Sequence, residues 1–171
     1  MDAVAKVTGQ ANYAIDASVP DMLFGHVVRA ERAHAQILGI DVQAALDVPG
    51  VSGVVTAADL EGLFPRYGHI KADHPILAID KVRFYGEPVA LVIADTPHAA
   101  SDAAEAVRVR YQDLPFVTDP DAALAPDAPL LHDTDYPAGD DSFGEAMSER
   151  RTDNIAHEAT LEWGDLDAEM A

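Results

Sequence analysis

The sequence predicts an α+β domain, and a strand–helix–strand stretch near its middle carries most of that prediction. Residues 88–94 (PVALVIA) are almost wholly apolar and rich in β-branched side chains, as in a strand that is buried on both faces. Residues 97–107 place alanines on one helical face and polar side chains on the other. Residues 107–111 (VRVRY) then alternate apolar and charged side chains, which is typical of a strand with one solvent-exposed face.

The helix in this stretch has clear start signals. Thr96 can accept a hydrogen bond at the helix N-terminus, and Pro97 has a backbone φ that already suits the first turn. The apolar face consists almost entirely of alanine: Ala99, Ala100, Ala103, Ala104 and Val107. Because alanine is small, we expect this helix to lie close against the sheet that it covers.

Further strands are predicted on the N-terminal side of this stretch. After a polar lead-in over residues 6–20, apolar side chains dominate or alternate in three segments: 22–30, 36–42 and 51–56. A short helix is predicted at 43–47 with Asp41 as its cap, because a Pro-Gly pair follows and ends it. Thr56 and Asp59 have the spacing of a capping box, which predicts one more helical turn.

The stretch 61–78 is predicted to be an irregular loop, since it holds two prolines and two glycines among side chains of mixed polarity. Strand character resumes at 80–84, and a helical turn is predicted at 121–124.

The C-terminal part is predicted to be a connector followed by a strand. Residues 126–153 are acidic and rich in proline, with Phe143 and Met147 as the expected apolar anchors. Residues 155–163 alternate apolar and polar side chains, which predicts a half-buried strand, and 164–169 indicate a turn into a new helix.

Composition excludes several classes of function. The 171 residues contain 11 Lys and Arg against 30 Asp and Glu, so the formal net charge is −19. Such a chain does not suit nucleic acid or an anionic membrane surface as a partner, because both need a basic patch. The chain has no cysteine, which excludes disulfides, thiolate nucleophiles and thiolate-bound iron–sulfur clusters within it. With no apolar signal core and no run of about 20 apolar residues, a cytoplasmic location is expected.

One loop offers a candidate metal site. His69, Asp73 and His74 lie close together in GHIKADHP, and two imidazoles with a carboxylate are a common ligand set. The loop lacks the helical i, i+4 spacing that would bring these side chains together, so a polar loop contact is the competing interpretation.

Other candidate residues have simpler structural interpretations. Glu87 enters the buried strand, where it either faces a cleft with a raised pKa or, in the preferred interpretation, has a hydrogen-bonded structural role. His157 lies on the apolar face of the last predicted strand, as core and interface histidines do. Arg108 and Arg110 share a strand face without basic neighbours, which indicates a solvated face. No partner is predicted for the remaining candidates, His26, His34 and His98. The residues alone therefore predict no catalytic, cofactor-binding or metal-ligating site.

Several long runs resemble one enzyme family. The central runs are GEPVALVIA, a helix containing AxDAAEAV, and VRYQDLPFVTDPDAAL; KVTGQANYAIDASVPDML, HAQILGIDVQAALDVPGVSGVVTAADL and DHPILAIDKVRFYGEPVA extend the likeness over most of the chain. Together they resemble the N-terminal α/β-hammerhead domain of the molybdopterin-binding subunit of the xanthine dehydrogenase and aldehyde oxidase family. This resemblance implies a mixed sheet with a few short packed helices over residues 1–132. Residues 133–171 would then form the acidic connector, the final strand and the start of a cofactor domain.

The resemblance also implies a function for the parent enzyme. Members of this family hydroxylate a substrate carbon with oxygen from water, using a molybdenum–pterin cofactor, [2Fe–2S] clusters and usually FAD. Their cofactor loops and catalytic glutamate match nothing in this sequence, so no catalytic, cofactor-binding or metal residue is carried over. The expected role is non-catalytic: assembly with the molybdenum-cofactor portion and the iron–sulfur portion. The loop YGHIKADHPILA favours the xanthine-type branch.

The sequence stops at GDLDAEMA, where the family continues, and we therefore expect either an excised piece or a naturally split small subunit. Two alternatives remain open at this point: a free-standing acidic binding module, and a small metal-dependent enzyme that uses His69, Asp73 and His74.

Overall fold

The structure is a computed structural model that describes residues 2–63, 66–68, 73–132, 154–155 and 163–164. The chain forms two compact units. The first unit comprises Met1–Pro65 and Leu77–Gln112, and the second comprises Arg66–Ile76 and Asp113–Ala171.

The main sheet of the first unit has three antiparallel strands in the order β1 (Phe24–Arg29), β7 (Pro88–Ala94) and β3 (Val51–Thr56). β7 lies in the centre, where neighbours on both sides use its backbone hydrogen-bonding groups. Its side chains Val89, Ala90, Val92 and Ala94 are fully buried, which confirms the predicted buried strand. The apolar run predicts this central position, because the central strand of a small covered sheet is shielded from water on both of its faces.

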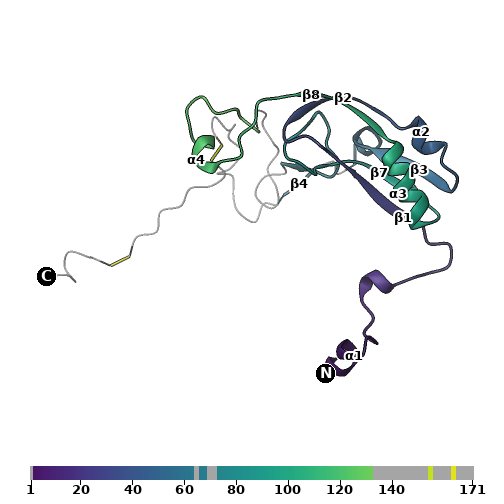
Figure 1. Ribbon diagram of the computed structural model, residues 1–171. Coiled ribbons are helices and arrows are strands. Elements are labelled where there is room, and N and C mark those ends of the chain that lie inside the picture. The colour runs from purple at the N-terminus through teal and green to yellow at the C-terminus, as the bar shows by residue number, and fades with distance from the viewer. Residues whose placement is uncertain (1, 64–65, 69–72, 133–153, 156–162, 165–171) are drawn as a thin grey trace. The chain divides into compact units, whose positions relative to one another are not determined.

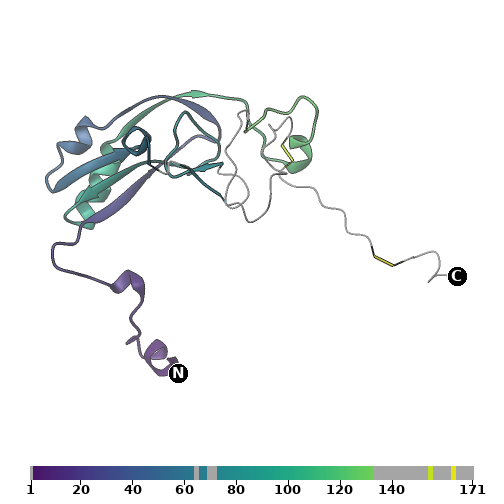
Figure 2. The same ribbon diagram turned by 180° about the vertical axis from the view of Figure 1, so that it is seen from behind.

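Helix α3 (Pro97–Ala106) lies over the strands of this sheet, as Figures 1 and 2 show. It starts as predicted: the Thr96 Oγ1 accepts a hydrogen bond from the Ala99 N–H at 3.1 Å, and Pro97 occupies the first turn. Ala100 and Ala103 are buried against the sheet, so the small side chains allow the close packing that the sequence predicts. Ala103 belongs to one core cluster with Ala45, Val92 and Val107.

A second sheet of the first unit has the order β6 (Lys81–Val82), β2 (Ala35–Asp41) and β8 (Arg108–Asp113). The predicted strand at 107–111 is confirmed, but the chain does not return to β7 after α3: β8 joins β2 instead. The strand predicted at 80–84 is shorter than expected, since only Lys81 and Val82 pair with β2. A second core cluster fills this region: Ala30, Ala35, Ala78, Val82 and Val89.

Short helical elements connect these strands as predicted. In α2 (Gln43–Leu46), the Asp41 carboxylate accepts a hydrogen bond from the Gln43 N–H at 3.0 Å. The 3₁₀ helix η2 (Ala57–Leu60) opens with a capping box, in which the Asp59 carboxylate accepts from the Thr56 N–H at 2.7 Å and the Thr56 hydroxyl at 2.9 Å. These two hydrogen bonds lower the pKa of Asp59.

The polar lead-in contains two helical elements that the sequence pattern did not predict: α1 (Ala3–Val7) and η1 (Ala14–Asp16). α1 buries no side chain, so it has no apolar periodicity that could have indicated it. An ion pair between Lys6 and Asp2, 2.6 Å apart, spans its single turn.

The described part of the second unit contains β4 (Arg66–Tyr67), β5 (His74–Pro75) and α4 (Pro120–Ala123). β4 and β5 pair antiparallel, so the prediction of an unstructured loop over 61–78 was wrong at these residues. Strands of two residues are too short to show alternation. The predicted turn at 121–124 is confirmed, with the Asp119 carboxylate accepting from the Ala122 N–H at 2.8 Å.

The Asn154 side chain links α4 to the segment that follows it through hydrogen bonds. Its Nδ2 donates to the carbonyl oxygens of Ala123 and Pro129, both at 3.1 Å. Phe143, Met147, most of the connector, and the predicted strand and helix at the C-terminal end lie outside the described residues. The boundary predicted at residue 132 stays a prediction. None of the described helices has the length and apolar character that crossing a membrane requires.

Candidate functional site

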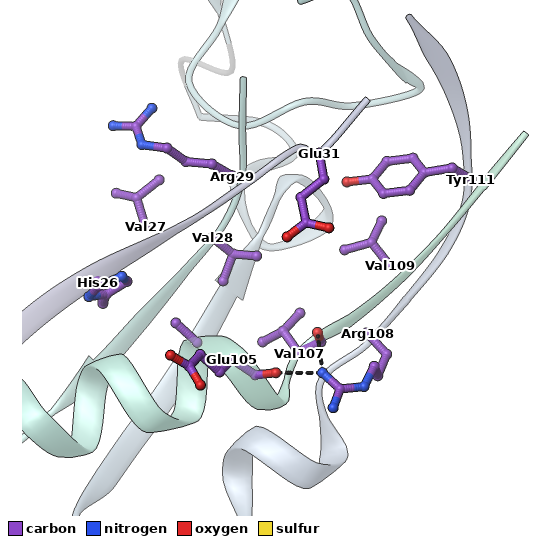
Figure 3. A pocket seen from close by; sticks show the side chains of 11 residues that line it. His26, Val27, Val28, Arg29, Glu31, Glu105, Val107, Arg108, Val109 and Tyr111 are labelled. Carbon is purple, nitrogen blue, oxygen red and sulfur yellow. Dashed lines mark hydrogen bonds between the residues drawn. The ribbon is translucent and has the colours of Figure 1, made fainter. Parts of the chain in front are cut away.

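One cavity of the first unit, with a volume of about 470 Å³, could receive a ligand or a partner. It lies between β1 on one side and the end of α3 with the start of β8 on the other (Figure 3). A volume of this size is within the range of about 300–1,000 Å³ that is usual for ligand pockets.

The cavity runs along the edge of β1. Four consecutive residues of this strand line it: His26, Val27, Val28 and Arg29. Side chains of a strand alternate between its two faces, so a cavity that meets four in a row lies beside the strand rather than over one face. β1 is an outer strand of its sheet, because β7 is its only neighbour among the described strands.

The base of the cavity is apolar, and its rim is charged. Val28, Val107 and Val109 project into the space between the two strands, with Glu31 above them and Glu105 below them in Figure 3. Neither carboxylate makes a hydrogen bond or an ion pair with the described residues. The cavity therefore combines an apolar base with two available negative charges.

The two arginines on the rim are both held by backbone carbonyls. Arg108 Nη1 donates to the Glu105 oxygen at 2.5 Å and to the Val107 oxygen at 3.3 Å, and these bonds satisfy carbonyls at the C-terminus of α3. Arg29 Nη1 donates to the Gly86 oxygen at 2.9 Å. Arg108 is exposed, as predicted, and its guanidinium in addition binds the end of α3 and borders the cavity.

Tyr111 closes one end of the cavity, with its hydroxyl turned toward Glu31 in Figure 3. Burial raises the pKa of Tyr111, while the positive charge of Arg32 acts in the opposite direction. The Arg32 guanidinium lies 5.8 Å from the centre of the tyrosine ring, within cation–π range.

Next to β1, the turn between β6 and β7 buries several charged groups: Lys81, Arg83 and Glu87. Glu87 is 3% exposed, and its Oε2 accepts a hydrogen bond from the Arg83 N–H at 2.5 Å. Arg83 Nη1 donates to the Lys81 oxygen at 3.2 Å, and its Nη2 lies 3.5 Å from Asp80 Oδ1. These contacts confirm the structural role predicted for Glu87.

The candidate metal loop is described only in part. His74 Nε2 lies 3.7 Å from Asp73 Oδ1, and the imidazole stacks on the Tyr67 ring at 5.6 Å. His69 lies outside the described residues. Among the residues that the structure describes, no group of three or more His, Asp or Glu side chains could hold a metal ion. Asp73 and His74 thus make a polar contact within the loop, and a metal site that includes His69 stays a prediction.

The other predicted candidates are dispersed. His26 lines the cavity, His34 is buried, and His98 is exposed in the first turn of α3. Arg110 is exposed, as predicted, and His157 lies outside the described residues. Sequence analysis missed Glu31, Glu105 and Tyr111 because nothing in the linear pattern shows that the ends of β1 and α3 meet β8.

Comparison with known proteins places this arrangement in a family. The family described as "Aldehyde oxidase and xanthine dehydrogenase, a/b hammerhead domain" matches residues 8–115, well over half of the chain. The chain belongs to this family. The fold is therefore the α+β hammerhead domain that the sequence predicts, built here from small antiparallel sheets with a few short helices.

Relatives of the hammerhead chain include large chains of molybdenum hydroxylases. The chain is 45% identical over 130 residues to the carbon monoxide dehydrogenase large chain of Afipia carboxidovorans, covering 73% of this chain and 16% of that protein. It is 39% identical over 132 residues to a probable xanthine dehydrogenase component of Bacillus subtilis, covering 77% and 18%. A crystal structure of the Cu,Mo-CO dehydrogenase superposes with a TM-score of 0.73 at 41% identity, covering 81% and 18%. The hammerhead chain thus spans about a sixth of the length of these relatives.

The described residues that line the cavity do not suit the cofactors of such enzymes. Without cysteine, the chain supplies no thiolate to an iron–sulfur cluster. The cavity exposes the carboxylates of Glu31 and Glu105, which would repel an anionic, phosphate-bearing pterin. No described residue is therefore assigned to either cofactor.

Proposed function

We propose that this chain is the hammerhead portion of the large subunit of a molybdenum hydroxylase, and that its role is to assemble with the molybdenum-cofactor portion and the iron–sulfur portion of that enzyme. The family match over residues 8–115 carries the proposal. The relatives that align with the chain are themselves named as large chains or subunits of larger enzymes, which supports a role within an assembly.

The chemistry of the described residues supports a structural rather than a catalytic role. The buried charges at Arg83 and Glu87 are both directed at backbone groups within one turn: the guanidinium donates to the Lys81 carbonyl, and the carboxylate accepts from the Arg83 N–H. Arg29 and Arg108 likewise bind backbone carbonyls. Charged groups that hold loops in place in this way are not free to transfer protons or bind a substrate.

The parent enzyme would hydroxylate a carbon atom with oxygen from water, with molybdopterin, [2Fe–2S] clusters and FAD supplying the redox chemistry outside this chain. The substrate class is not set by the hammerhead portion. Relatives named for carbon monoxide and for xanthine align with similar identities, 45% and 39%, over nearly the same length. The preference for a xanthine-type enzyme stays a prediction.

The test is recovery of metals with the tagged chain. The gene is tagged in its native host, the chain is purified by affinity, and molybdenum and iron are quantified by mass spectrometry in the same fractions. We expect both metals in fixed proportion to the chain, and their loss when 1 M salt or mild urea dissociates the complex. Recovery of the chain with neither metal, from cells that make active molybdenum enzymes, would refute the proposal.

A further inference from the structure

We propose that the cavity along β1 is a docking groove in which an extended, net-basic segment of the parent enzyme, from outside this chain, pairs with the free edge of β1. This inference rests on the proposed function. Its physical basis is an open strand edge, an apolar base and two unengaged carboxylates in one place (Figure 3).

The strand edge is the first element. Within the part of the chain that the structure describes, β1 pairs only with β7, so every second residue of the segment 24–28 directs its N–H and C=O away from the sheet. Exposed edges are normally protected by proline, lysine or a covering element, because an open edge pairs with any extended chain. The segment 24–28 contains neither proline nor lysine, and the cavity lies beside it. Strand addition is a common form of peptide recognition.

The register shift between Val28 and Arg29 sets the limit of this edge. Beyond it, Arg29 Nη1 is bound to the Gly86 oxygen, and the backbone of Ala30 pairs with Glu87 and Gly86. An added strand therefore pairs over residues 24–28 and meets Glu31 at the end of the groove.

Charge identifies the chemistry of the occupant. The chain carries a net charge of −19, and the groove presents Glu31 and Glu105 without a cation from the described residues bound to either. The rim also carries Arg29 and Arg108, whose guanidinium groups donate to carbonyl oxygens and keep their positive charge, so the preference for a basic segment rests mainly on the net charge of the chain. A segment with lysine or arginine near both ends would neutralise both carboxylates and cover the valines of the base with its apolar residues.

The lengths of the relatives indicate where the docking segment comes from. The chain covers 16% and 18% of the carbon monoxide dehydrogenase and xanthine dehydrogenase relatives named above, so most of each of these two proteins lies outside the aligned part and is available to pack against it. A second copy of this acidic chain is the poorer candidate, because two highly negative surfaces repel each other.

Two matched double variants of the assembled enzyme test the groove. Glu31→Lys/Glu105→Lys reverses both groove charges, and Glu61→Lys/Asp102→Lys makes the same change in net charge at positions of the first unit outside the groove. Asp102 lies on α3 like Glu105, so one member of each pair tests the same helix. Far-UV circular dichroism first confirms that both variants fold.

We expect the groove variant to bind the rest of the enzyme about tenfold or more weakly at low salt, since an exposed ion pair is lost and replaced by repulsion at each end. The control variant should change affinity by less than about threefold. Hydrogen exchange adds a direct readout: amides of residues 24–28 that exchange rapidly in the chain alone should be protected in the assembled enzyme. Protection together with selective weakening supports the groove.

Three results would overturn the inference. Equal weakening by both variants would show a general charge effect, and unprotected β1 amides in an intact enzyme would show that the edge stays open. Protection of β1 through a dimer of this chain alone, detected by light scattering, would identify a different occupant. If the unmodified chain recovers neither molybdenum nor iron, the proposed function itself fails, whereas normal recovery with an insensitive groove refutes only the docking site.

Discussion

Replacement of Gly50 by alanine tests how the end of β7 is joined to the start of β3. Gly50 has a φ of +88°, a backbone conformation that favours glycine. Its carbonyl accepts a hydrogen bond from the Asp95 N–H at 2.9 Å. A Cβ at this position would lie 3.0 Å from Asp95 Cγ and closer still to its Oδ1. The substitution therefore strains the backbone and also displaces the Asp95 carboxylate.

The magnitude can be estimated from these two effects. An L-residue in the left-handed region costs about 1–2 kcal/mol. Moving Asp95 out of its preferred rotamer adds about 0.5–1.5 kcal/mol. We expect Gly50→Ala to lower the free energy of unfolding by about 2–3 kcal/mol, a large part of the stability of a domain of this size.

Urea unfolding followed by far-UV circular dichroism measures the effect as a shift of the midpoint at constant slope. Gly53→Ala in β3 is the matched control, because its Cβ would meet no heavy atom within 4 Å and its φ is not positive. That control should be neutral or stabilising by about 0.5–1 kcal/mol. In the Asp95→Ala background, Gly50→Ala should cost only the backbone part, about 1–2 kcal/mol. Equal midpoints for Gly50→Ala and Gly53→Ala would refute the reasoning.

Three further predictions concern other parts of the chain. Thr96→Ala removes the cap of α3 and should cost about 1 kcal/mol in urea unfolding, whereas Thr96→Ser should retain most of the stability; equal losses would argue against the cap. Burial raises the folded-state pKa of Tyr111, so the stability that this tyrosine contributes is complete below its unfolded pKa of about 10 and is lost as the pH rises through the folded value. Tyr111→Phe should therefore flatten the alkaline decline measured by urea midpoints, and an unchanged decline would contradict this. Trp163, the single tryptophan, is 83% exposed, and its fluorescence should shift to shorter wavelength when the rest of the enzyme is added; an unchanged spectrum on assembly would exclude it from the interface.

Features that depend on a few neighbouring residues could be predicted from the sequence. The cap at Thr96, the capping box at Thr56 and Asp59, and the buried strand β7 all arise from short-range hydrogen bonds or from one apolar run. In each case, the signal and the structure that it indicates are close together in the chain. Local chemistry therefore determines these elements almost independently of the rest of the fold.

Choices of partner between distant segments could not be predicted in this way. The alternation of apolar and charged side chains in β8 indicates a strand with one solvent-exposed face. A strand beside β7 and a strand beside β2 could both have this pattern, and in the structure β8 pairs with β2. The strand character predicted at 80–84 does not show that Lys81 and Arg83 are buried, with the Arg83 guanidinium donating to the Lys81 carbonyl and the Arg83 backbone N–H donating to the Glu87 carboxylate. Burial of a charge depends on acceptors that the folded chain brings near it, so composition alone does not reveal it.

The same reasoning explains why an assembly surface leaves so little trace in the sequence. A catalytic site needs particular side chains at particular spacings, whereas pairing along a strand edge uses N–H and C=O groups that every residue except proline possesses. In the sequence, the proposed groove at β1 is marked only by the lack of proline and lysine in the segment 24–28. The carboxylates that follow β1 and lie on α3 become neighbours only in the folded chain. In a domain whose proposed role is assembly, the strand order of the sheet identifies the candidate surface, and charge reversal at Glu31 and Glu105 tests it.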